Sequence, residues 1–293
     1  MMMPAMQAVA SLTDDNKVDV VLGDWNDNRK PAILEILDRW SVVGNIFKPP
    51  YKFNPNGYDL WFHSYHGSNT EVVNVFKHKM NYKPVAKPAW KSSLIHEVDH
   101  YMEIAYAMGY RGPVPKVDFP LAEGPDLSDR KRPIVGICNG FFNVGYWEKK
   151  AWPHFDSFIE VAKRYFKGTV VGIGSRGELD GIGIDEENDF SEKLSITETA
   201  KVISQMDVLV TSDTGNMHIA DMMDIPVVTL FGSTLISKNG PRSNKAVVLS
   251  SGAECAPCQD TGRFYNCKNY VCMESIRVGD VVPIVKQKLN GGR

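Results

Sequence analysis

Short apolar runs alternate with helical patterns along the first third of the chain. Residues 6–12 read as part of a helix. Val18–Leu22 reads as a strand, and the turn residues Gly23 and Asp24 follow it. A helical pattern over 29–40, a second β-like run at 58–62 and a helix over Glu97–Met108 continue the alternation. Strands that alternate with helices in this way predict a parallel sheet with helices on its faces.

The same alternation restarts after residue 133 and is more regular there. The predicted strands are 134–138, 169–173, 207–210 and 226–231, and the predicted helices are 155–166, 196–206 and 216–223. Ser195 stands where the N-cap of the second of these helices is expected. The order predicts a second sheet of the same kind, so the expected fold class is α/β with two Rossmann-like domains.

Residues 111–133 separate the two series of elements. They contain five prolines and two glycines with weak periodicity, which is typical of an interdomain linker. We therefore place one domain at 1–128 and the other at 129–293. Two domains of this kind would form a cleft at the carboxyl ends of their strands, where ligands bind.

The composition narrows the class of protein. Of the 293 residues, 43% are hydrophobic and 23% are charged, which is typical of a soluble globular protein. The formal net charge of −2, without a basic tract, argues against a nucleic-acid partner. No apolar run approaches the roughly 20 residues of a membrane span, and the N-terminus lacks the positive region of a signal peptide. We expect a cytoplasmic protein whose contact with membranes, if any, is peripheral.

The segment 207–220 contains the most informative group of candidate site residues. A buried strand runs into Asp213, Thr214 and Gly215, and a helix starts at once. The backbone N–H groups of such a helix N-terminus favour an anion, and the Thr214 hydroxyl adds a donor. Asp213 requires hydroxyl groups or a cation beside it, and His218 lies in the first turn of the helix. The alternative is structural: Asp213 caps the helix and His218 packs against a strand.

A second motif supports a different function. Gly172–Gly177 follows a strand and matches the Gly-x-Gly-x-x-Gly pattern of dinucleotide sites. It predicts a nucleotide-binding oxidoreductase as an alternative. The pattern is weak evidence, because the strand is the second of its domain and the sequence shows no clear helix behind it.

The chain has five cysteines, four of which are clustered. Cys255, Cys258, Cys267 and Cys272 have paired spacings that suit a closed, structural zinc site. Reduced free thiols and disulfides are the alternatives, and a cytoplasmic location disfavours disulfides. Cys138 lies in an apolar strand and is most simply a core residue.

The order of motifs in the second half resembles glycosyltransferase family 9, the lipopolysaccharide heptosyltransferases. The family signature Asp-Thr/Ser-Gly-x-x-His is present at 213–218, and Pro-x-Val-x-Leu-Phe-Gly follows at 226–232. Upstream, Lys150-Ala-Trp-Pro is similar to the family's Lys-x-Trp-Pro. The resemblance implies the two-lobed GT-B fold and inverting transfer of a sugar, with heptose as one candidate. It further implies a nucleotide-diphosphate donor, a lipopolysaccharide or other glycan or lipid-linked acceptor, and no cofactor required for catalysis.

The same resemblance implies roles for individual residues. Lys150 would contact the donor diphosphate, where it can neutralise charge that grows on the leaving group. Glu178, at the end of the glycine-rich turn, would contact the ribose. The donor site as a whole would consist of Lys150, Glu178, Asp213, Thr214, Gly215 and His218.

The start of the chain bears on activity. Residues 4–9 resemble the opening of the family's first helix, which in the family follows a strand and a Gly-Asp loop. The loop aspartate is the family's general base, so the resemblance implies that the first strand, the loop and the base precede Met1. The catalytic residue is then unknown, activity would be impaired, and Asp24 is a weak substitute. A non-catalytic nucleotide-sugar-binding relative is the third functional alternative.

Overall fold

A computed structural model describes residues 1–22, 30–48, 52, 95–140 and 145–291. The chain divides into two compact units, Met1–Pro120 and Leu121–Arg293. The division falls inside the proline-rich segment 111–133, ahead of the boundary that we placed after residue 128.

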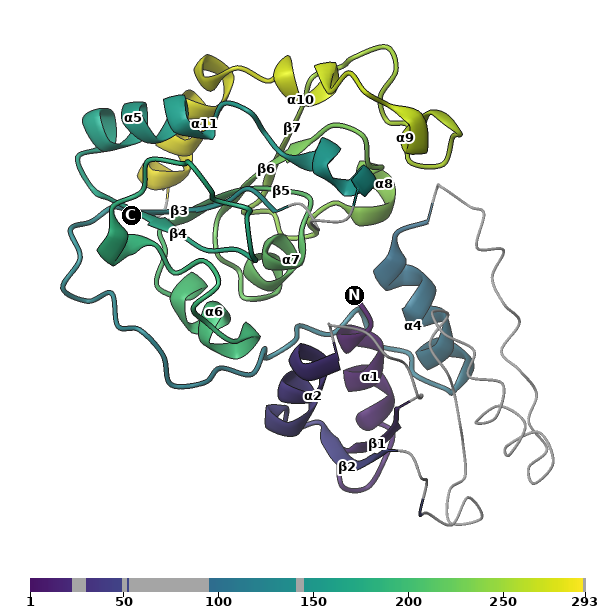
Figure 1. The fold of residues 1–293 in the computed structure, drawn as a ribbon. Coiled ribbons are helices and arrows are strands. Elements are labelled where there is room, and N and C mark those ends of the chain that lie inside the picture. Colours follow the sequence, from purple (N-terminus) through teal and green to yellow (C-terminus); the bar gives the residue numbers. More distant parts are fainter. Residues whose placement is uncertain (23–29, 49–51, 53–94, 141–144, 292–293) are drawn as a thin grey trace. The chain divides into compact units, whose positions relative to one another are not determined.

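The described part of the first unit contains a small parallel sheet and helices. Its elements are α1 (Met3–Ala10), β1 (Val18–Val21), α2 (Lys30–Arg39), β2 (Val43–Phe47) and α4 (Glu97–Ala107). Strands β1 and β2 pair in parallel, and α1 lies against α4 (Figure 1). Met6 of α1 and Met102 of α4 are buried. The predicted strand at 18–22 and the predicted helices at 29–40 and 97–108 are thus found, whereas β2 was not predicted. The predicted strand at 58–62 lies outside the described residues.

The second unit is built on a five-stranded parallel sheet. Its strands are β3 (Ile134–Cys138), β4 (Thr169–Gly172), β5 (Val208–Ser212), β6 (Val227–Phe231) and β7 (Val247–Ser250). Its α-helices are α5 (Phe155–Phe166), α6 (Ile196–Ile203), α7 (Gly215–Met222), α8 (Ile236–Asn239), α9 (Arg263–Asn266), α10 (Val271–Glu274) and α11 (Val278–Gly291), and two 3₁₀ helices are η2 (Gly145–Lys150) and η3 (Glu186–Asn188). The predicted α/β class with parallel sheets is confirmed.

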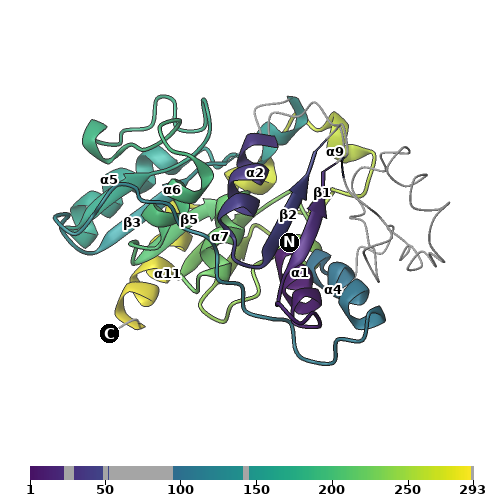
Figure 2. The ribbon, with the colours of Figure 1, turned by 90° about the horizontal axis from the view of Figure 1, so that it is seen from below.

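The strand order in this sheet is β4-β3-β5-β6-β7. The chain moves from β3 to β4 in one direction, then crosses back over β3 to reach β5. Because crossovers between parallel strands are right-handed, this reversal puts α5 on one face of the sheet and α6 and α7 on the other. The helix α11 joins α5 on its face (Figures 1 and 2).

Helix α6 begins where the sequence predicts. The Ser195 hydroxyl accepts a hydrogen bond from the Glu198 amide, and the Glu198 carboxylate accepts one from the Ser195 amide. This capping box satisfies two N–H groups that would otherwise have no partner within the helix. The helix then packs over the sheet, and the chain continues into β5.

No described helix could cross a membrane. The longest of them, α11, has 14 residues and contains Pro283, whereas a span needs about 20 apolar residues. None of the helices in the described residues is long and apolar enough to span a bilayer.

The core of the second unit depends on the aromatic side chains of α5. Phe158 is fully buried and packs near the Trp152 ring, with the two ring centroids 6.0 Å apart. We predict that Phe158→Ala lowers the free energy of unfolding by about 3–5 kcal/mol, because the surrounding core cannot fill the cavity. Urea denaturation followed by circular dichroism measures the loss.

The control lies on the same helix. Val161 is 36% exposed, so Val161→Ala should change the free energy of unfolding by no more than about 0.5 kcal/mol. Equal effects of the two substitutions would contradict the assignment of Phe158 to the core.

Candidate functional site

The strand order reverses between β3 and β5, and open α/β sheets have a crevice outside the carboxyl ends of the strands at such a reversal. These strands are neighbours, and every residue in both of them is buried. The segment after β3 leads to α5 on one face of the sheet, and the segment after β5 leads to α7 on the other. Ligands of open α/β sheets bind outside the carboxyl ends of the strands at such a switch point. Two predicted site segments, around Lys150 and Asp213, follow these two strands.

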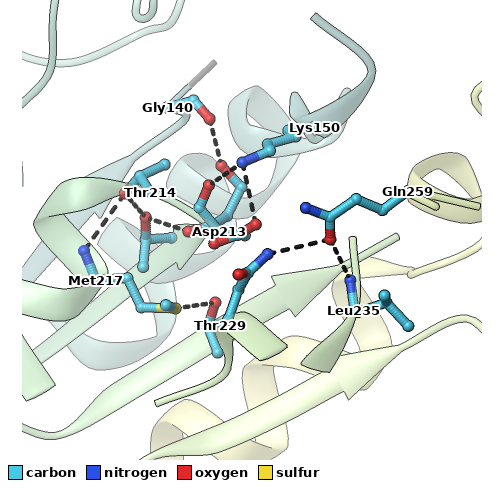
Figure 3. Close-up of polar contacts among 11 residues, drawn as sticks. Gly140, Lys150, Asp213, Thr214, Met217, Thr229, Leu235 and Gln259 are labelled. Carbon is cyan, nitrogen blue, oxygen red and sulfur yellow. Dashed lines mark hydrogen bonds and ion pairs between the residues drawn. The ribbon is translucent and has the colours of Figure 1, made fainter. Parts of the chain in front are cut away.

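The junction between β5 and α7 presents the start of a helix to this crevice. Thr214 is the N-cap: its backbone is extended, and its hydroxyl accepts a hydrogen bond from the Met217 amide at 3.3 Å (Figure 3). Gly215 is the first residue of the helix, and a Cβ added there would meet no atom within 4 Å. The first N–H groups of a helix have no intrahelical partner, so this junction can bind an anion.

Lys150 reaches the junction from η2, on the other side of the crevice. Its ammonium lies 3.0 Å from the Asp213 carboxylate oxygen Oδ2 and donates to the Asp213 backbone carbonyl, also at 3.0 Å (Figure 3). The side chains of Lys150 and Asp213 are 17% and 6% exposed. The two contacts use two of the three N–H donors of the ammonium. The third can therefore be directed at a ligand.

This pairing resolves the difficulty that the sequence posed for Asp213. A carboxylate beside an anion site is repulsive unless a cation neutralises it, and Lys150 is that cation. Asp213 is not the helix cap, because Thr214 fills that position. The structural alternative of an Asp213 cap is thus wrong.

The segment after β3 is fastened to the same junction. The buried Ser212 hydroxyl donates to the Gly140 carbonyl at 2.7 Å (Figure 3). A Cβ on Gly140 would stand 2.1 Å from the Thr214 methyl group, so the absence of a side chain permits this close approach. The Asn139 side chain then accepts a hydrogen bond from the Trp152 amide at 2.7 Å. These residues were not predicted, although an Asn-Gly pair directly after a buried strand is a signal for them.

Cys138 lies beneath the junction and is a core residue, as predicted. It is fully buried, and burial raises its pKa to about 11, with a further contribution from the negative charge of Glu178. The Asn216 amide donates to its sulfur at 3.3 Å. Cys138 is therefore a neutral thiol that lies below the candidate site and is held by the hydrogen bond from Asn216.

Glu178 is buried near this end of the sheet. It is 7% exposed, and its Oε2 accepts a hydrogen bond from the Ser175 amide at 2.8 Å. Gly174 leaves room for this carboxylate, because a Cβ there would lie 2.7 Å from Oε2. His218 lies in the first turn of α7, where its amide donates to the Thr214 carbonyl at 3.4 Å.

The Gly172–Gly177 motif does not have the context of a dinucleotide site. Between residues 173 and 185, all of them described, the chain forms turns, and the next helical element is the short η3. The dinucleotide fingerprint requires a helix that opens directly behind the glycines, and its strand lies at the switch point. Here β4 is at the edge of the sheet. The structure therefore gives the oxidoreductase alternative no support.

None of the four clustered cysteines, all of them described, forms a disulfide. Cys258 and Cys272 are buried, and Cys255 and Cys267 are partly exposed. Burial raises the pKa of Cys258, and the charges of Cys267 and Cys255 raise it further. Burial, followed by the charges of the other three cysteines, raises the pKa of Cys272 to about 11.

The predicted zinc site does not appear as a ready ligand set. Among the residues that the structure describes, no group of three or more His, Cys, Asp or Glu side chains could hold a metal ion. A local reason is visible at Cys267, whose thiol donates to the Asn269 carbonyl at 3.2 Å. The zinc prediction therefore rests on the spacing of the cysteines alone. Asp24, the weak candidate for a base, lies outside the described residues.

A protein family matches most of the second unit. The model of the family described as glycosyltransferase family 9 (heptosyltransferase) matches residues 80–268. Lipopolysaccharide heptosyltransferase 2 of Salmonella typhimurium is 26% identical over 178 residues, which cover 52% of this chain and 50% of that protein. Lipopolysaccharide heptosyltransferase 1 of Pseudomonas aeruginosa is 38% identical over 125 residues, which cover 40% and 35%. The chain thus matches half or less of the length of these relatives.

Solved structures show the same fold. The Escherichia coli ADP-heptose lipopolysaccharide heptosyltransferase II has a TM-score of 0.70 at 16% identity, and the match covers 100% of this chain and 96% of that one. The iron-containing dodecameric glycosyltransferase TibC of enterotoxigenic E. coli has a TM-score of 0.60 at 13% identity, covering 99% and 72%. These similarities confirm the predicted GT-B fold class.

The approach of Gly140 to Thr214 gives a testable consequence. We predict that Gly140→Ala displaces Thr214 and weakens its cap on α7, at a cost of about 1–3 kcal/mol in the free energy of unfolding. Hydrogen exchange should be faster at the Met217 amide. Gly215→Ala, where a Cβ meets open space, is the matched control and should leave both quantities unchanged. Unchanged exchange at Met217 in Gly140→Ala would show that Gly140 is not needed to seat Thr214.

Proposed function

The chain belongs to glycosyltransferase family 9, and on that premise we propose that it transfers a sugar from a nucleoside-diphosphate donor to a glycan acceptor. Transfer would invert the configuration at the anomeric carbon. The observation that carries the proposal is the Lys150–Asp213 pair beside the start of α7, at the switch point of the sheet. All the predicted donor-binding residues lie within the region that the family matches.

The geometry supplies the electrostatics that such a reaction needs. The acceptor oxygen would form a bond to the anomeric carbon on the face opposite the diphosphate, while the bond from that carbon to the phosphate oxygen breaks. Negative charge then grows on the leaving diphosphate. Lys150, the Thr214 hydroxyl and the first N–H groups of α7 would stabilise this charge, because they are already in place before the reaction.

Asp213 has a different proposed role from that of a direct ligand to the sugar. Its carboxylate and its carbonyl both hold the Lys150 ammonium, so it fixes the direction in which the remaining N–H points. It also keeps the site close to neutral before the donor binds. The arriving diphosphate would then be attracted to the helix N-terminus rather than to an isolated lysine.

Glu178 and His218 would complete the donor site. The carboxylate of Glu178 is held by the Ser175 amide, and such an acceptor can bind the hydroxyl groups of a ribose. His218 lies on the helix that presents the anion site. The acceptor loses a proton in the reaction, and the base that takes it is not assigned; Asp24 lies outside the described residues.

The relatives suggest which compounds to test first. The E. coli neighbour is described as an ADP-heptose enzyme, and a TibC structure holds ADP-D-β-D-heptose. We therefore propose ADP-heptose as the first donor and a lipopolysaccharide-type glycan as the acceptor. Because a nucleotide-activated sugar is the substrate, the cytoplasm is the proposed location, with peripheral contact at the membrane that carries a lipid-linked acceptor. No nucleic acid and no required cofactor is part of this proposal.

We predict that Lys150→Ala and Asp213→Ala each weaken binding of ADP-heptose by about 10–100-fold. Each variant loses a charged hydrogen-bonding group, and Lys150→Ala leaves a buried carboxylate beside the diphosphate. Calorimetric titration measures the change. Asp180→Ala, at an exposed position of the loop after β4, is the control and should bind as the unchanged protein does.

Two outcomes would count against the proposal. Equal affinity in the unchanged protein and in both site variants would refute the assignment of the donor site. If the unchanged protein binds ADP-heptose but an activity assay detects no transfer to any glycan acceptor, the non-catalytic alternative is favoured.

We propose that the cysteine segment, residues 255–272, has a structural role and takes no direct part in sugar transfer. The spacing of its cysteines supports a bound zinc ion, whereas the arrangement of the described side chains does not. We predict about one equivalent of zinc in reduced protein prepared without chelator, because structural zinc is held with a large binding free energy. Elemental analysis that finds less than about 0.2 equivalents would contradict the zinc prediction. The cysteines would then be reduced free thiols.

A further inference from the structure

Lys149, which the proposed chemistry does not use, is buried. It is 2% exposed, although lysine is almost never buried without a partner. Its ammonium donates to the Phe264 backbone carbonyl and lies 4.7 Å from the centroid of the Phe264 ring. Lys149 therefore connects η2 to α9, which lies in the cysteine segment.

Phe264 is the centre of a second set of contacts with η2. It is 2% exposed, and its ring meets the edge of the Trp147 ring, with centroids 5.3 Å apart. The Trp147 ring in turn lies 4.6 Å from the Lys150 ammonium. One buried aromatic side chain thus contacts both Lys149 and the tryptophan on which the donor lysine rests.

We propose that Lys149 is a positioning residue that holds Lys150 in the donor site by fastening η2 to the cysteine segment. The inference rests on the proposed function, because it assigns Lys150 to the donor diphosphate. Lys149 would not touch the donor itself. It would act through Phe264 and Trp147, which set where the Lys150 side chain lies.

The geometry of η2 explains why such an anchor is needed. A 3₁₀ helix has three residues per turn, so consecutive side chains point about 120° apart. Lys149 can therefore point into the cysteine segment while Lys150 points at Asp213. A six-residue helix of this kind has little stability of its own, and its place depends on tertiary contacts. The carbonyl of Phe264 provides one of these contacts directly before Lys150.

The test separates positioning from a general loss of structure by using two probes. ADP contacts the diphosphate and nucleoside parts of the proposed site, whereas adenosine contacts the nucleoside part alone. We predict that Lys149→Met, which keeps the length of the side chain but removes the ammonium, weakens ADP binding by about tenfold. Adenosine binding should stay unchanged. Lys286→Met, which removes an exposed lysine over the Tyr165 ring, is the matched control and should change neither affinity.

A double-mutant cycle with Lys150→Ala gives a second readout. If Lys149 acts through Lys150, Lys149→Met should have no further effect on ADP affinity once Lys150 is alanine. Phe264→Leu, which keeps the backbone carbonyl but removes the ring beneath Trp147, should weaken ADP binding in the same selective way. It serves as the second variant should Lys149→Met not fold.

The outcomes distinguish the inference from the proposed function. If Lys150→Ala leaves ADP binding unchanged, the donor site is wrong, and the positioning role is wrong with it. If Lys150→Ala weakens ADP binding while Lys149→Met and Phe264→Leu bind as the unchanged protein does, the positioning role alone is overturned. Equal losses for ADP and adenosine, or losses that persist in the Lys150→Ala background, would also overturn it, because they indicate a merely structural lysine.

Discussion

The ion pair between Lys150 and Asp213 joins the two segments that the sheet separates at its switch point. Because the chain reverses direction between β3 and β5, the segments that follow these strands leave for opposite faces of the sheet. A crevice at that place is a consequence of topology, and almost any residues could line it. Here a lysine from one segment is bound twice by an aspartate of the other. The start of α7, the loop at Gly140 and the η2 helix all take their places relative to this contact.

The pair also explains how an acidic residue can belong to a site for a diphosphate. An isolated carboxylate would repel the ligand, and an isolated lysine with so little exposure would be costly to bury. Together they are almost neutral, and they leave one N–H of the ammonium free for use. A preorganised arrangement of this kind can stabilise charge in a transition state without reorganising during the reaction. The surrounding contacts at Ser212, Thr214 and Trp147 keep both partners in place.

Local patterns predicted the parts of the fold that are fully buried. The strands β3, β5 and β6 read as continuous apolar runs because both faces of the sheet are covered, and α5 matched its predicted bounds of 155–166. In contrast, β2 and β7 were missed. In β2, Gly44 and Asn45 interrupt the apolar residues, and β7 has only a short apolar run, 247–249, whose residues are half-buried. The long C-terminal helix α11 was missed as well; it carries Pro283 in its interior. The predicted cap at Ser195 was right because a capping box is read from four consecutive residues.

In the candidate site, too, features set by neighbouring residues were predicted, and contacts between distant residues were not. Thr214 and Gly215 were predicted from a strand-to-helix junction within a few residues, whereas the partner of Asp213 lies 63 positions away in the sequence. The burial of Lys149 depends on Phe264, 115 positions away, so no local pattern could distinguish it from an exposed lysine. Hydrogen–deuterium exchange with and without ADP-heptose tests the central claim most directly. The account predicts protection of 145–150 and of 213–218 when the donor binds, and saturable binding without protection of either segment would contradict it.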